Sequence, residues 1–349
     1  MWNGSETDLF ATMTVSPPDV SAATAEAIAL QHWGISARAK PLSGERDRNF
    51  HLFADDGREY VLKFANPAEK ADVRKMQIAA LRHLERVDSG LATPRIVPLP
   101  DGALEVQLPQ VAGPALHARL LTWVAGDFIY SSRRSAAQRV AYGNALARLQ
   151  LALGTFSHPG ADYPLCWDVR QSLRLREISF TIPHAPARAL VGELLDEFEA
   201  RVTPLLPTLR RQVVHNDVHG YNTFVDPANH DRITGVIDFG DMVLTAVVFD
   251  LAIAAGSQPA ADMRAPEALG HFVDGFHAVR PLLPVELELL PLLIATRTAM
   301  GLTLASWHRH AQPDNPHFTL TEERIVGRMT SIAEIRSPEV EATLRQRMC

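Results

Sequence analysis

The chain has 349 residues, of which 46% are apolar and 21% are charged, and its formal net charge at pH 7 is −6. This length exceeds what one small core supports, so two lobes are expected, and the mild acidity indicates neither a nucleic-acid partner nor an anionic membrane. Two cysteines, Cys166 and Cys349, are too few for a disulfide framework or a cysteine-based zinc site, and they suit a reducing, cytoplasmic location.

No targeting or membrane segment is expected. The first residues lack a basic start and include Glu6 and Asp8, which argues against a signal peptide. The longest apolar stretch, about 282–294, is interrupted by two prolines and two glutamates, so it should not span a membrane. Residues 1–20 are predicted to form a flexible tail.

A helix is predicted over 21–33, followed by strands at 40–42 and 49–54 that flank a polar segment. This segment is either an ordinary turn or a loop whose backbone N–H groups fold over phosphates. It holds a single glycine and lacks a full glycine-rich pattern, so the segment alone favours the ordinary turn. The candidate phosphate contacts are Ser43, Gly44 and Asn49.

A hairpin is predicted at Asp56-Gly57, because Asp-Gly favours the tight turns that join antiparallel strands. The next strand, 59–64, contains Lys63 between two apolar residues. A lysine at such a place is usually an exposed alternate position. Its position after a loop and a hairpin favours a second interpretation, in which it pairs with nucleotide phosphates as the strand lysine of kinases does.

A second helix is predicted to open at Asn66 as the N-cap, with Pro67 in the first turn and Glu69 completing a capping pair. Gln77 lies on the inward-facing stripe of this helix. A protein kinase places a glutamate there to pair with the strand lysine, whereas a glutamine can offer Lys63 only a hydrogen bond.

Two further strands, 104–108 and 117–124, complete a small first lobe of about five strands. Its last residues, Thr122 and Val124, offer backbone groups either to a purine edge or to an ordinary edge-strand turn. The rest of the chain is predicted to be mainly helical. Its helices include one that ends at Gly154, one that stops near Pro204, one that starts near Val248, and three or four over 267–345.

The strongest signal is the pattern H-x-D-x-x-x-x-N from His215 to Asn222, followed by D-F-G at Asp238. Phosphoryl transfer needs a carboxylate at the acceptor hydroxyl, which Asp217 would supply as base and orienter. Asn222 and Asp238 are the hard oxygen ligands that Mg²⁺ prefers. Each of the two patterns is a weak signal alone, but H-x-D-x-x-x-x-N followed by D-F-G predicts a phosphotransferase. His215 is expected to brace the turn.

Only nine residues, 241–249, separate the D-F-G turn from the next predicted helix, and no A-P-E follows. A protein kinase needs a longer segment there to dock a peptide, so the acceptor is predicted to be a small molecule enclosed by the C-terminal helices. Asp241 is a candidate partner for an acceptor ammonium. Further candidate contacts, for which core or surface positions are the simpler interpretation, are Arg297, Trp307 and His308.

Together these motifs resemble the aminoglycoside phosphotransferase and choline kinase superfamily, and within it the hydroxylysine kinase-like group. The resemblance covers about residues 30–305. At the position of Gln77 the aminoglycoside kinases carry a glutamate. The glutamine here is similar to what the hydroxylysine kinase-like group carries at this position. The residues that carry the resemblance are 43–44, 47, 49–50, 60–63, 66–67, Gln77, 119–122, 215–222 and 235–242.

The resemblance implies an α+β, bilobal protein-kinase-like fold. The first lobe, 21–124, would be a small antiparallel β-sheet that binds nucleotide, and the second, 125–349, would be mainly helical. The resemblance also implies Mg²⁺ and ATP or GTP as donor. Lys63, helped by Gln77, would contact the α- and β-phosphates.

The predicted function is transfer of the γ-phosphoryl group to a hydroxyl of an amino-alcohol or amino-acid-like metabolite, with hydroxylysine, homoserine and aminoglycosides all compatible. Two alternatives stay open. One is a metal-dependent hydrolase that uses His215, Asp217 and His219 as ligands. The other is a non-catalytic nucleotide-binding protein on the same fold. The sequence leaves the donor nucleotide and the oligomeric state open.

Overall fold

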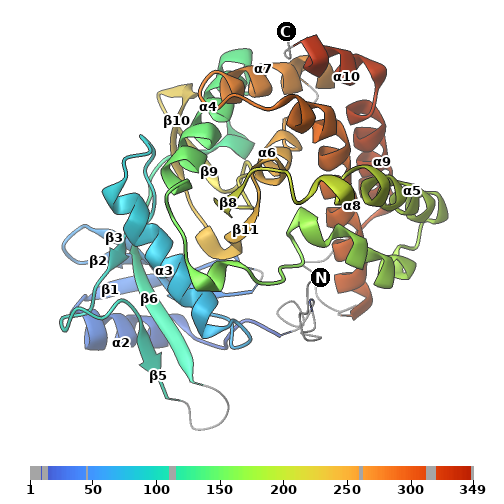
Figure 1. The fold of residues 1–349 in the computed structure, drawn as a ribbon. Coiled ribbons are helices and arrows are strands. Elements are labelled where there is room, and N and C mark those ends of the chain that lie inside the picture. Colours follow the sequence, from blue (N-terminus) through green and yellow to red (C-terminus); the bar gives the residue numbers. More distant parts are fainter. Residues whose placement is uncertain are drawn as a thin grey trace. The chain divides into compact units, whose positions relative to one another are not determined.

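The computed structural model describes residues 9, 15–44, 46–109, 115–258, 262–311 and 320–346. The chain divides into two compact units (Figure 1). The first unit comprises 1–87, 92–125 and 158–160, and the second comprises 88–91, 126–157 and 161–349. The predicted α+β class is confirmed, because the first unit is built on an antiparallel sheet and the second is mainly helical. Most of the predicted tail, 1–20, lies outside the described residues.

The sheet of the first unit has the strand order β1-β2-β3-β6-β4, with β5 beside β6. Its strands are β1 (Ala37–Leu42), β2 (Arg48–Ala54), β3 (Glu59–Phe64), β4 (Ile96–Val97), β5 (Val106–Leu108) and β6 (Leu116–Thr122). The hairpin predicted at Asp56-Gly57 is confirmed, with a φ of 83° at Gly57 between β2 and β3. The sequence prediction missed β4, which is only two residues long.

The two faces of this sheet have different characters. On one face, α2 (Ala22–Trp33) packs its buried Ala29 against a core that includes Leu62. Successive side chains of a strand point to opposite faces, so Lys63, next to Leu62, lies on the other face. Lys63 is paired across the ladder with Arg119 of β6, which places both cations on that second face.

The helix after β3 starts later than predicted. α3 (Ala71–Arg86) begins after Lys70, so Asn66 is not its N-cap. The side chain of Asn66 instead accepts the Ala68 N–H within a separate turn, and its own backbone N–H donates to Asp47 at 2.8 Å. These contacts hold Asn66 in a turn that precedes the helix.

The strands of the second unit carry the predicted catalytic segments between them. β8 (Arg211–Val214) pairs with β11 (Val243–Ala246), and β9 (Thr223–Asp226) lies between β7 (Asp127–Phe128) and β10 (Asn229–Val236). The segment 215–222 therefore joins β8 to β9, and the D-F-G turn joins β10 to β11. Antiparallel pairing of these four strands holds the two segments in one place.

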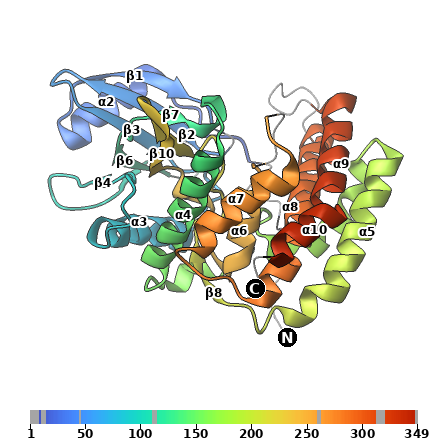
Figure 2. The same cartoon turned by 90° about the horizontal axis from the view of Figure 1, so that it is seen from above.

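Helices form the rest of the second unit, and α8 packs against α5, α6, α9 and α10 (Figure 2). The helices predicted to end at Gly154 and near Pro204, the helix predicted to start near Val248, and the C-terminal helices are confirmed. The α-helices are α4 (Ala136–Leu153), α5 (Ala185–Arg201), α6 (Val247–Ala255), α7 (Ala265–His277), α8 (Pro284–Ala311), α9 (Glu322–Ile335) and α10 (Pro338–Arg345). Short 3-10 helices are η1 (Ile129–Ser131), η2 (Pro159–Ala161), η3 (Val169–Glu177), η4 (Ser179–Thr181), η5 (Thr203–Leu205) and η6 (Phe239–Asp241).

The prolines near 282–294 do not interrupt the apolar stretch as the sequence suggested. Pro284 is the first residue of α8, and Pro291 lies inside the helix. α8 is long and apolar enough to cross a membrane by length and composition, but 83% of its most apolar 18-residue window is buried inside the protein. Burial of this kind is also found for the core helix of a globular fold.

Candidate active site

The backbone is bent sharply at two places in the predicted catalytic segments. Among the described non-glycine residues, only Asn216 (φ 65°) and Asp238 (φ 64°) have a positive φ. L-residues rarely adopt this conformation, and it persists only where the surrounding structure enforces it, commonly at functional sites. One bend directly precedes Asp217, and the other is at the predicted metal ligand.

His215 is fully buried and holds the start of the catalytic loop. Its Nε2 lies 3.0 Å from the carbonyl oxygen of Ile237, and its Nδ1 accepts the N–H of Asp217 at 3.2 Å. A carbonyl can only accept, so Nε2 carries the proton and the ring is neutral. The ring also meets the Phe239 ring edge-on, with centroids 4.6 Å apart. His215 thereby links the catalytic loop to the D-F-G turn.

The carboxylate of Asp217 is held by three neighbouring side chains. Asn222 Nδ2 donates to Asp217 Oδ2 at 2.7 Å and to the Asp217 carbonyl at 3.0 Å. His219 Nε2 lies 3.4 Å from the same Oδ2, and Arg297 Nη2 of α8 lies 3.9 Å from Oδ1. Burial lowers the pKa of His219, but the hydrogen bond and charge of Asp217 outweigh this and hold it above its ordinary value.

Asn222 and Asp238 are suited to hold a divalent cation. The backbone N–H of Ile237 donates to the Asn222 carbonyl at 2.9 Å, so the residue before Asp238 lies directly opposite Asn222. The amide nitrogen of Asn222 points to Asp217, which turns its amide oxygen elsewhere. One amide oxygen and one carboxylate are ligands that Mg²⁺ or Ca²⁺ accepts while other coordination positions stay available to phosphate oxygens.

A buried carboxylate in α6 that the sequence analysis did not single out supports the loop from beneath. Asp250 is 1% exposed, and its Oδ1 accepts the Asn216 N–H at 2.8 Å. Its Oδ2 accepts from Gln150 Nε2 of α4 at 2.8 Å. Burial raises the pKa of Asp250, against the lowering effect of Gln150. A lone carboxylate within the apolar segment VVFDLA was the signal that could have revealed it.

The metal-dependent hydrolase hypothesis is wrong in its choice of ligands. Both ring nitrogens of His215 hydrogen-bond to the backbone, so neither is available to a metal. Among the described residues, His215, Asp217 and His219 do not form a group that could hold an ion, and neither do any other three His, Cys, Asp or Glu side chains.

In the first unit, Lys63 forms a buried ion pair. Its Nζ lies 2.7 Å from Asp47 Oδ2, and the two side chains are 10% and 13% exposed. Burial raises the pKa of Asp47, but the charge and hydrogen bond of Lys63 outweigh it and hold the pKa below its ordinary value. Asp47 is the last residue of the loop between β1 and β2, so the ion pair ties that loop to β3.

Gln77 belongs to a second buried network beside Lys63. Its Nε2 donates to Glu69 at 2.7 Å, and its Oε1 accepts from Arg119 Nη2 at 2.6 Å. The prediction that Glu69 caps the helix is therefore wrong. Burial and the charge of Asp47 raise its pKa above the ordinary value. The amide of Gln77 thus bridges a buried carboxyl group and a buried guanidinium.

The predicted phosphate loop is partly described, since residue 45 lies outside the described residues. A Cβ on Gly44 would lie 2.7 Å from the Asp47 carbonyl oxygen, so the close turn requires glycine. Asn49 is paired across the hairpin with Lys63. At the end of β6, the Thr122 hydroxyl accepts the Arg95 N–H, and Val124 is buried.

A family model described as the phosphotransferase enzyme family matches residues 38–282, well over half of the chain. The chain belongs to this phosphotransferase family. Hydroxylysine kinase of Danio rerio is 25% identical over 93% of this chain and 95% of its own. Hydroxylysine kinase of Mus musculus is 25% identical over 81% of each chain. The chain is therefore an enzyme that transfers a phosphoryl group, and the non-catalytic alternative is set aside.

Solved structures support the kinase-like fold of this phosphotransferase. A microcompartment-associated aminopropanol kinase superposes with a TM-score of 0.68 at 19% identity, covering 92% of this chain and 95% of its own. An amicoumacin kinase in complex with AMP-PNP, Ca²⁺ and Ami gives 0.68 at 18% identity, covering 95% and 96%. The fold that the sequence predicted, a small antiparallel sheet with a mainly helical remainder, is confirmed.

The candidate acceptor contacts of the phosphotransferase lie in different surroundings. Arg297 lies over the Trp167 ring, 4.5 Å from its centroid, which fixes the guanidinium beside the catalytic loop. His308 is 2% exposed within α8, and burial lowers its pKa to about 4. Trp307 meets His308 edge-on, and Asp241 is 7% exposed in η6. Of the four candidates, only Arg297 lines the pocket next to the catalytic loop.

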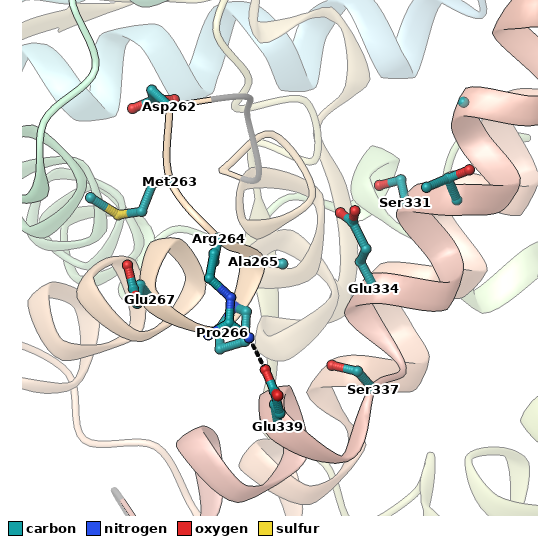
Figure 3. Close-up of a pocket in the computed structure, with 12 residues that line it drawn as sticks. Asp262, Met263, Arg264, Ala265, Pro266, Glu267, Ser331, Glu334, Ser337 and Glu339 are labelled. Carbon is teal, nitrogen blue, oxygen red and sulfur yellow. Dashed lines mark hydrogen bonds and ion pairs between the residues drawn. The ribbon is translucent and has the colours of Figure 1, made fainter.

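That pocket, called here the arginine pocket, has a volume of about 730 Å³ and lies within the second unit. Its lining residues are His219, Ile253, Gly256, Ser257, Arg297, Thr298, Ala305, Leu320, Arg324, Gly327, Arg328 and Ser331. A second pocket, shown in Figure 3, shares Gly327 and Ser331 with it and is lined by Asp262, Glu267, Glu334 and Glu339 among others. Two pockets of different charge therefore adjoin along α9.

Proposed function

We propose that this phosphotransferase moves the γ-phosphoryl group of ATP or GTP to a hydroxyl of a small amino-alcohol or amino-acid-like metabolite. The observation that carries the proposal is the fixed position of the Asp217 carboxylate. Asn222 donates a hydrogen bond to it, and it directly follows the strained backbone at Asn216. His215 links this segment to the second strained turn, at Asp238. Such fixed positioning supplies most of the catalysis in phosphoryl transfer, where the protein does little covalent chemistry.

Asp217 is assigned the role of orienting the acceptor hydroxyl and accepting its proton. His215 is neutral, and its hydrogen bonds occupy both nitrogens, so it serves as a brace. Asn222 and Asp238 would hold Mg²⁺, and the metal would neutralise phosphate charge when bound. Lys63 is assigned to the nucleotide phosphates, with Gln77 as an indirect support through its own network.

A small acceptor is supported by the short path from the D-F-G turn to α6. η6, β11 and α6 follow one another almost without a break, so no peptide-docking segment of the protein-kinase type is present among these described residues. Relatives named hydroxylysine kinase and a neighbour named aminopropanol kinase act on small hydroxylated amines, which favours the same substrate class here. We place the enzyme in the cytoplasm, where nucleoside triphosphates are abundant and where the buried free Cys166 would stay reduced.

The test is phosphoryl transfer from ATP and from GTP, with Mg²⁺, to 5-hydroxylysine, homoserine, 3-aminopropan-1-ol and an aminoglycoside. Asp217→Asn serves as the blank. We expect transfer above the blank to a small hydroxylated amine. Transfer to the aminoglycoside alone would move the substrate class to resistance-type kinases. Nucleotide hydrolysis without transfer to any acceptor would overturn the proposal.

A further inference from the structure

The arginine pocket lies next to the carboxylate of Asp217. Two of its lining side chains, His219 and Arg297, lie 3.4 Å and 3.9 Å from the Asp217 carboxylate oxygens. A molecule that fills this pocket therefore lies next to the group that would orient its hydroxyl. All of its lining residues belong to the second unit.

Three arginines gather at this pocket, and no Asp or Glu is among its described lining residues. Arg297 comes from α8, while Arg324 and Arg328 are one turn apart on α9. The burial of Arg328 lowers its pKa, and the charges of Arg297 and Arg324 lower it further, so the three cations lie close enough to repel one another. Like charges held together in this way favour an anion among them.

The positions of the arginines are set by the structure around them. Arg297 lies over Trp167, and Arg328 Nη1 donates to the Thr298 carbonyl at 3.5 Å. The guanidinium of Arg328 also occupies the place that a side chain at Gly301 would fill, so the glycine lets it lie along α8. Arg297 and Arg328 are therefore held in place relative to α8 without a ligand.

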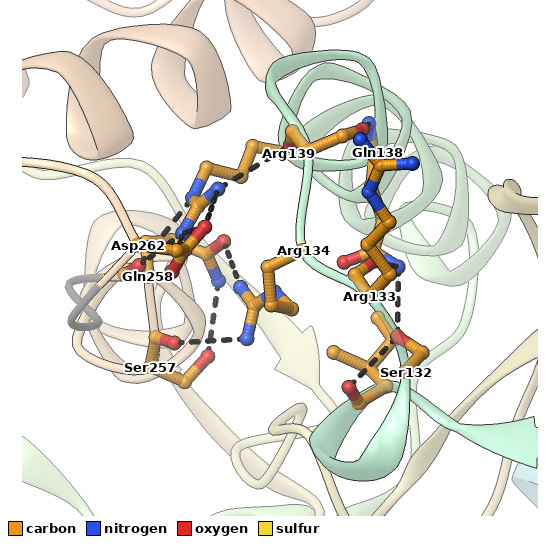
Figure 4. A network of polar contacts seen from close by, with 10 residues as sticks. Ser132, Arg133, Arg134, Gln138, Arg139, Ser257, Gln258 and Asp262 are labelled. Carbon is orange, nitrogen blue, oxygen red and sulfur yellow. Dashed lines mark hydrogen bonds and ion pairs between the residues drawn. The ribbon is translucent and has the colours of Figure 1, made fainter.

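Another part of the pocket lining, at the end of α6, is fixed by a separate network of polar contacts (Figure 4). Arg134 donates to the carbonyl of Ser257 at 3.4 Å and to Gln258 Oε1 at 2.8 Å. Arg139, fully buried in α4, donates to the carbonyl of Gln258 and pairs with Asp262 at 3.1 Å. These contacts hold the segment of Ser257, which is one of the lining residues of the pocket.

We propose that the arginine pocket binds an anionic group of the phosphate acceptor, a carboxylate, and that the enzyme therefore selects hydroxy acids over hydroxylated amines that lack one. This inference rests on the proposed function and names its substrate class. Arginine binds carboxylates through two parallel N–H groups, which also fixes orientation. The adjoining pocket of Figure 3, where four carboxylates outnumber the single cation Arg264, would suit an ammonium of the same acceptor.

The anion could come from two sources, the acceptor carboxylate or a phosphate of the donor, and kinetics separates them. The probes are homoserine and 3-aminopropan-1-ol, which differ only by the carboxylate. We expect Arg328→Gln to raise the KM for homoserine by about 10- to 100-fold, the loss typical of one charged hydrogen bond. The KM for ATP, the kcat and the KM for 3-aminopropan-1-ol should change little.

Two further variants guard against a merely structural effect. Arg328→Lys keeps the charge and should recover part of the affinity for homoserine. Arg345→Gln removes an exposed arginine of α10 that lines neither pocket, and it should leave all constants unchanged. Equal losses for homoserine and 3-aminopropan-1-ol, or a change confined to the KM for ATP, would overturn the proposal.

Calorimetric titration of homoserine without nucleotide separates this inference from the proposed function. Binding that is lost in Arg328→Gln supports the carboxylate site even where no phosphoryl transfer is detected. Transfer to 3-aminopropan-1-ol that exceeds transfer to homoserine in the wild type would leave phosphotransferase activity intact and contradict the carboxylate site.

Discussion

Lys63 and Asp47 form an ion pair that water scarcely reaches, and removing one partner of such a pair is more harmful than removing both. The Asp47 carboxylate also accepts the Asn66 N–H at 2.8 Å, so it joins the β1–β2 loop, β3 and the turn before α3. The stability of the first unit should therefore depend on the charge of this one side chain.

Asp47→Asn is expected to lower the free energy of unfolding by about 3 kcal/mol at pH 7, the loss typical of a broken buried pair. The pKa of Asp47 is held below its ordinary value of 3.8, so its stabilisation is present above that pH and is lost as pH falls through the folded-state pKa. Urea unfolding of both proteins from pH 7 to pH 3 should show the difference shrinking toward acid.

Asp56→Asn is the matched control, because Asp56 pairs with Arg58 in solvent. An exposed pair contributes little to stability, so this variant should unfold like the wild type. An Asp47→Asn protein as stable as wild type at pH 7 would show that the ion pair does not stabilise the first unit.

At the residue scale, the sequence predicted which residues carry the chemistry better than it predicted which residues contact one another. H-x-D-x-x-x-x-N and D-F-G identify Asp217, Asn222 and Asp238 because phosphoryl transfer restricts both residue type and spacing. The partners of Gln77 and the support from Asp250 depend on which elements pack together. Local pattern does not contain that information, so the capping role expected for Glu69 was wrong.

The crossing of α4 and α7 depends on two glycines that let the helix backbones touch. A Cβ on Gly143 would overlap the carbonyl oxygen of Phe272, and one on Gly275 would overlap that of Val140. Backbone atoms cannot move aside as the end of a flexible side chain can. The α4 helix also carries Gln150, which supports Asp250, so this crossing bears on the catalytic loop.

Gly143→Ala is expected to destabilise the protein by about 2–3 kcal/mol through overpacking against backbone. The control is Gly192→Ala in α5, where nothing lies within 4 Å of the new Cβ. That change should stabilise the protein by about 0.5–1 kcal/mol, since alanine is the better helix former. Urea denaturation compares the three proteins, and a Gly143→Ala variant as stable as Gly192→Ala would contradict the close crossing.

At the element scale, periodicity located the long helices, and turn residues located the hairpin at Asp56-Gly57. The failures have physical reasons. α3 starts four residues later than predicted, because Asn66 lies in a separate turn, where its backbone N–H donates a tertiary hydrogen bond to Asp47. α8 continues through Pro291 because surrounding helices bury it, and packing of this kind outweighs local propensity.

At the scale of the whole molecule, nucleotide binding should be coupled to stability. A ligand that binds only the folded state at 100 times its Kd adds about 2.7 kcal/mol to the free energy of unfolding. We expect ATP with Mg²⁺ to raise the Tm more than ATP alone, because Asn222 and Asp238 would hold the metal on the phosphates. Asp238→Asn should keep the increment of ATP alone and lose the part that requires Mg²⁺. An unchanged Mg²⁺ increment in that variant would remove Asp238 from the metal site.

The family of this molecule was predictable because its motifs are spread over most of the chain and occur in a fixed order. The charge of the arginine pocket was not predictable from the sequence. Arg324 and Arg328 look like solvated positions of an amphipathic helix, and only the packing of α9 on α8 places them at the pocket. Arg297 was named in advance, whereas Trp167 beneath it was not.

The central claim is that Asp217 is the catalytic carboxylate of a phosphotransferase, and its most direct test is turnover in Asp217→Asn. The substitution keeps the size of the side chain and removes its capacity to take a proton. With ATP, Mg²⁺ and an accepted hydroxylated amine, kcat should fall by about 10²- to 10⁴-fold while the Kd for ATP stays unchanged. Turnover near the wild-type rate, with ATP still bound, would contradict the account.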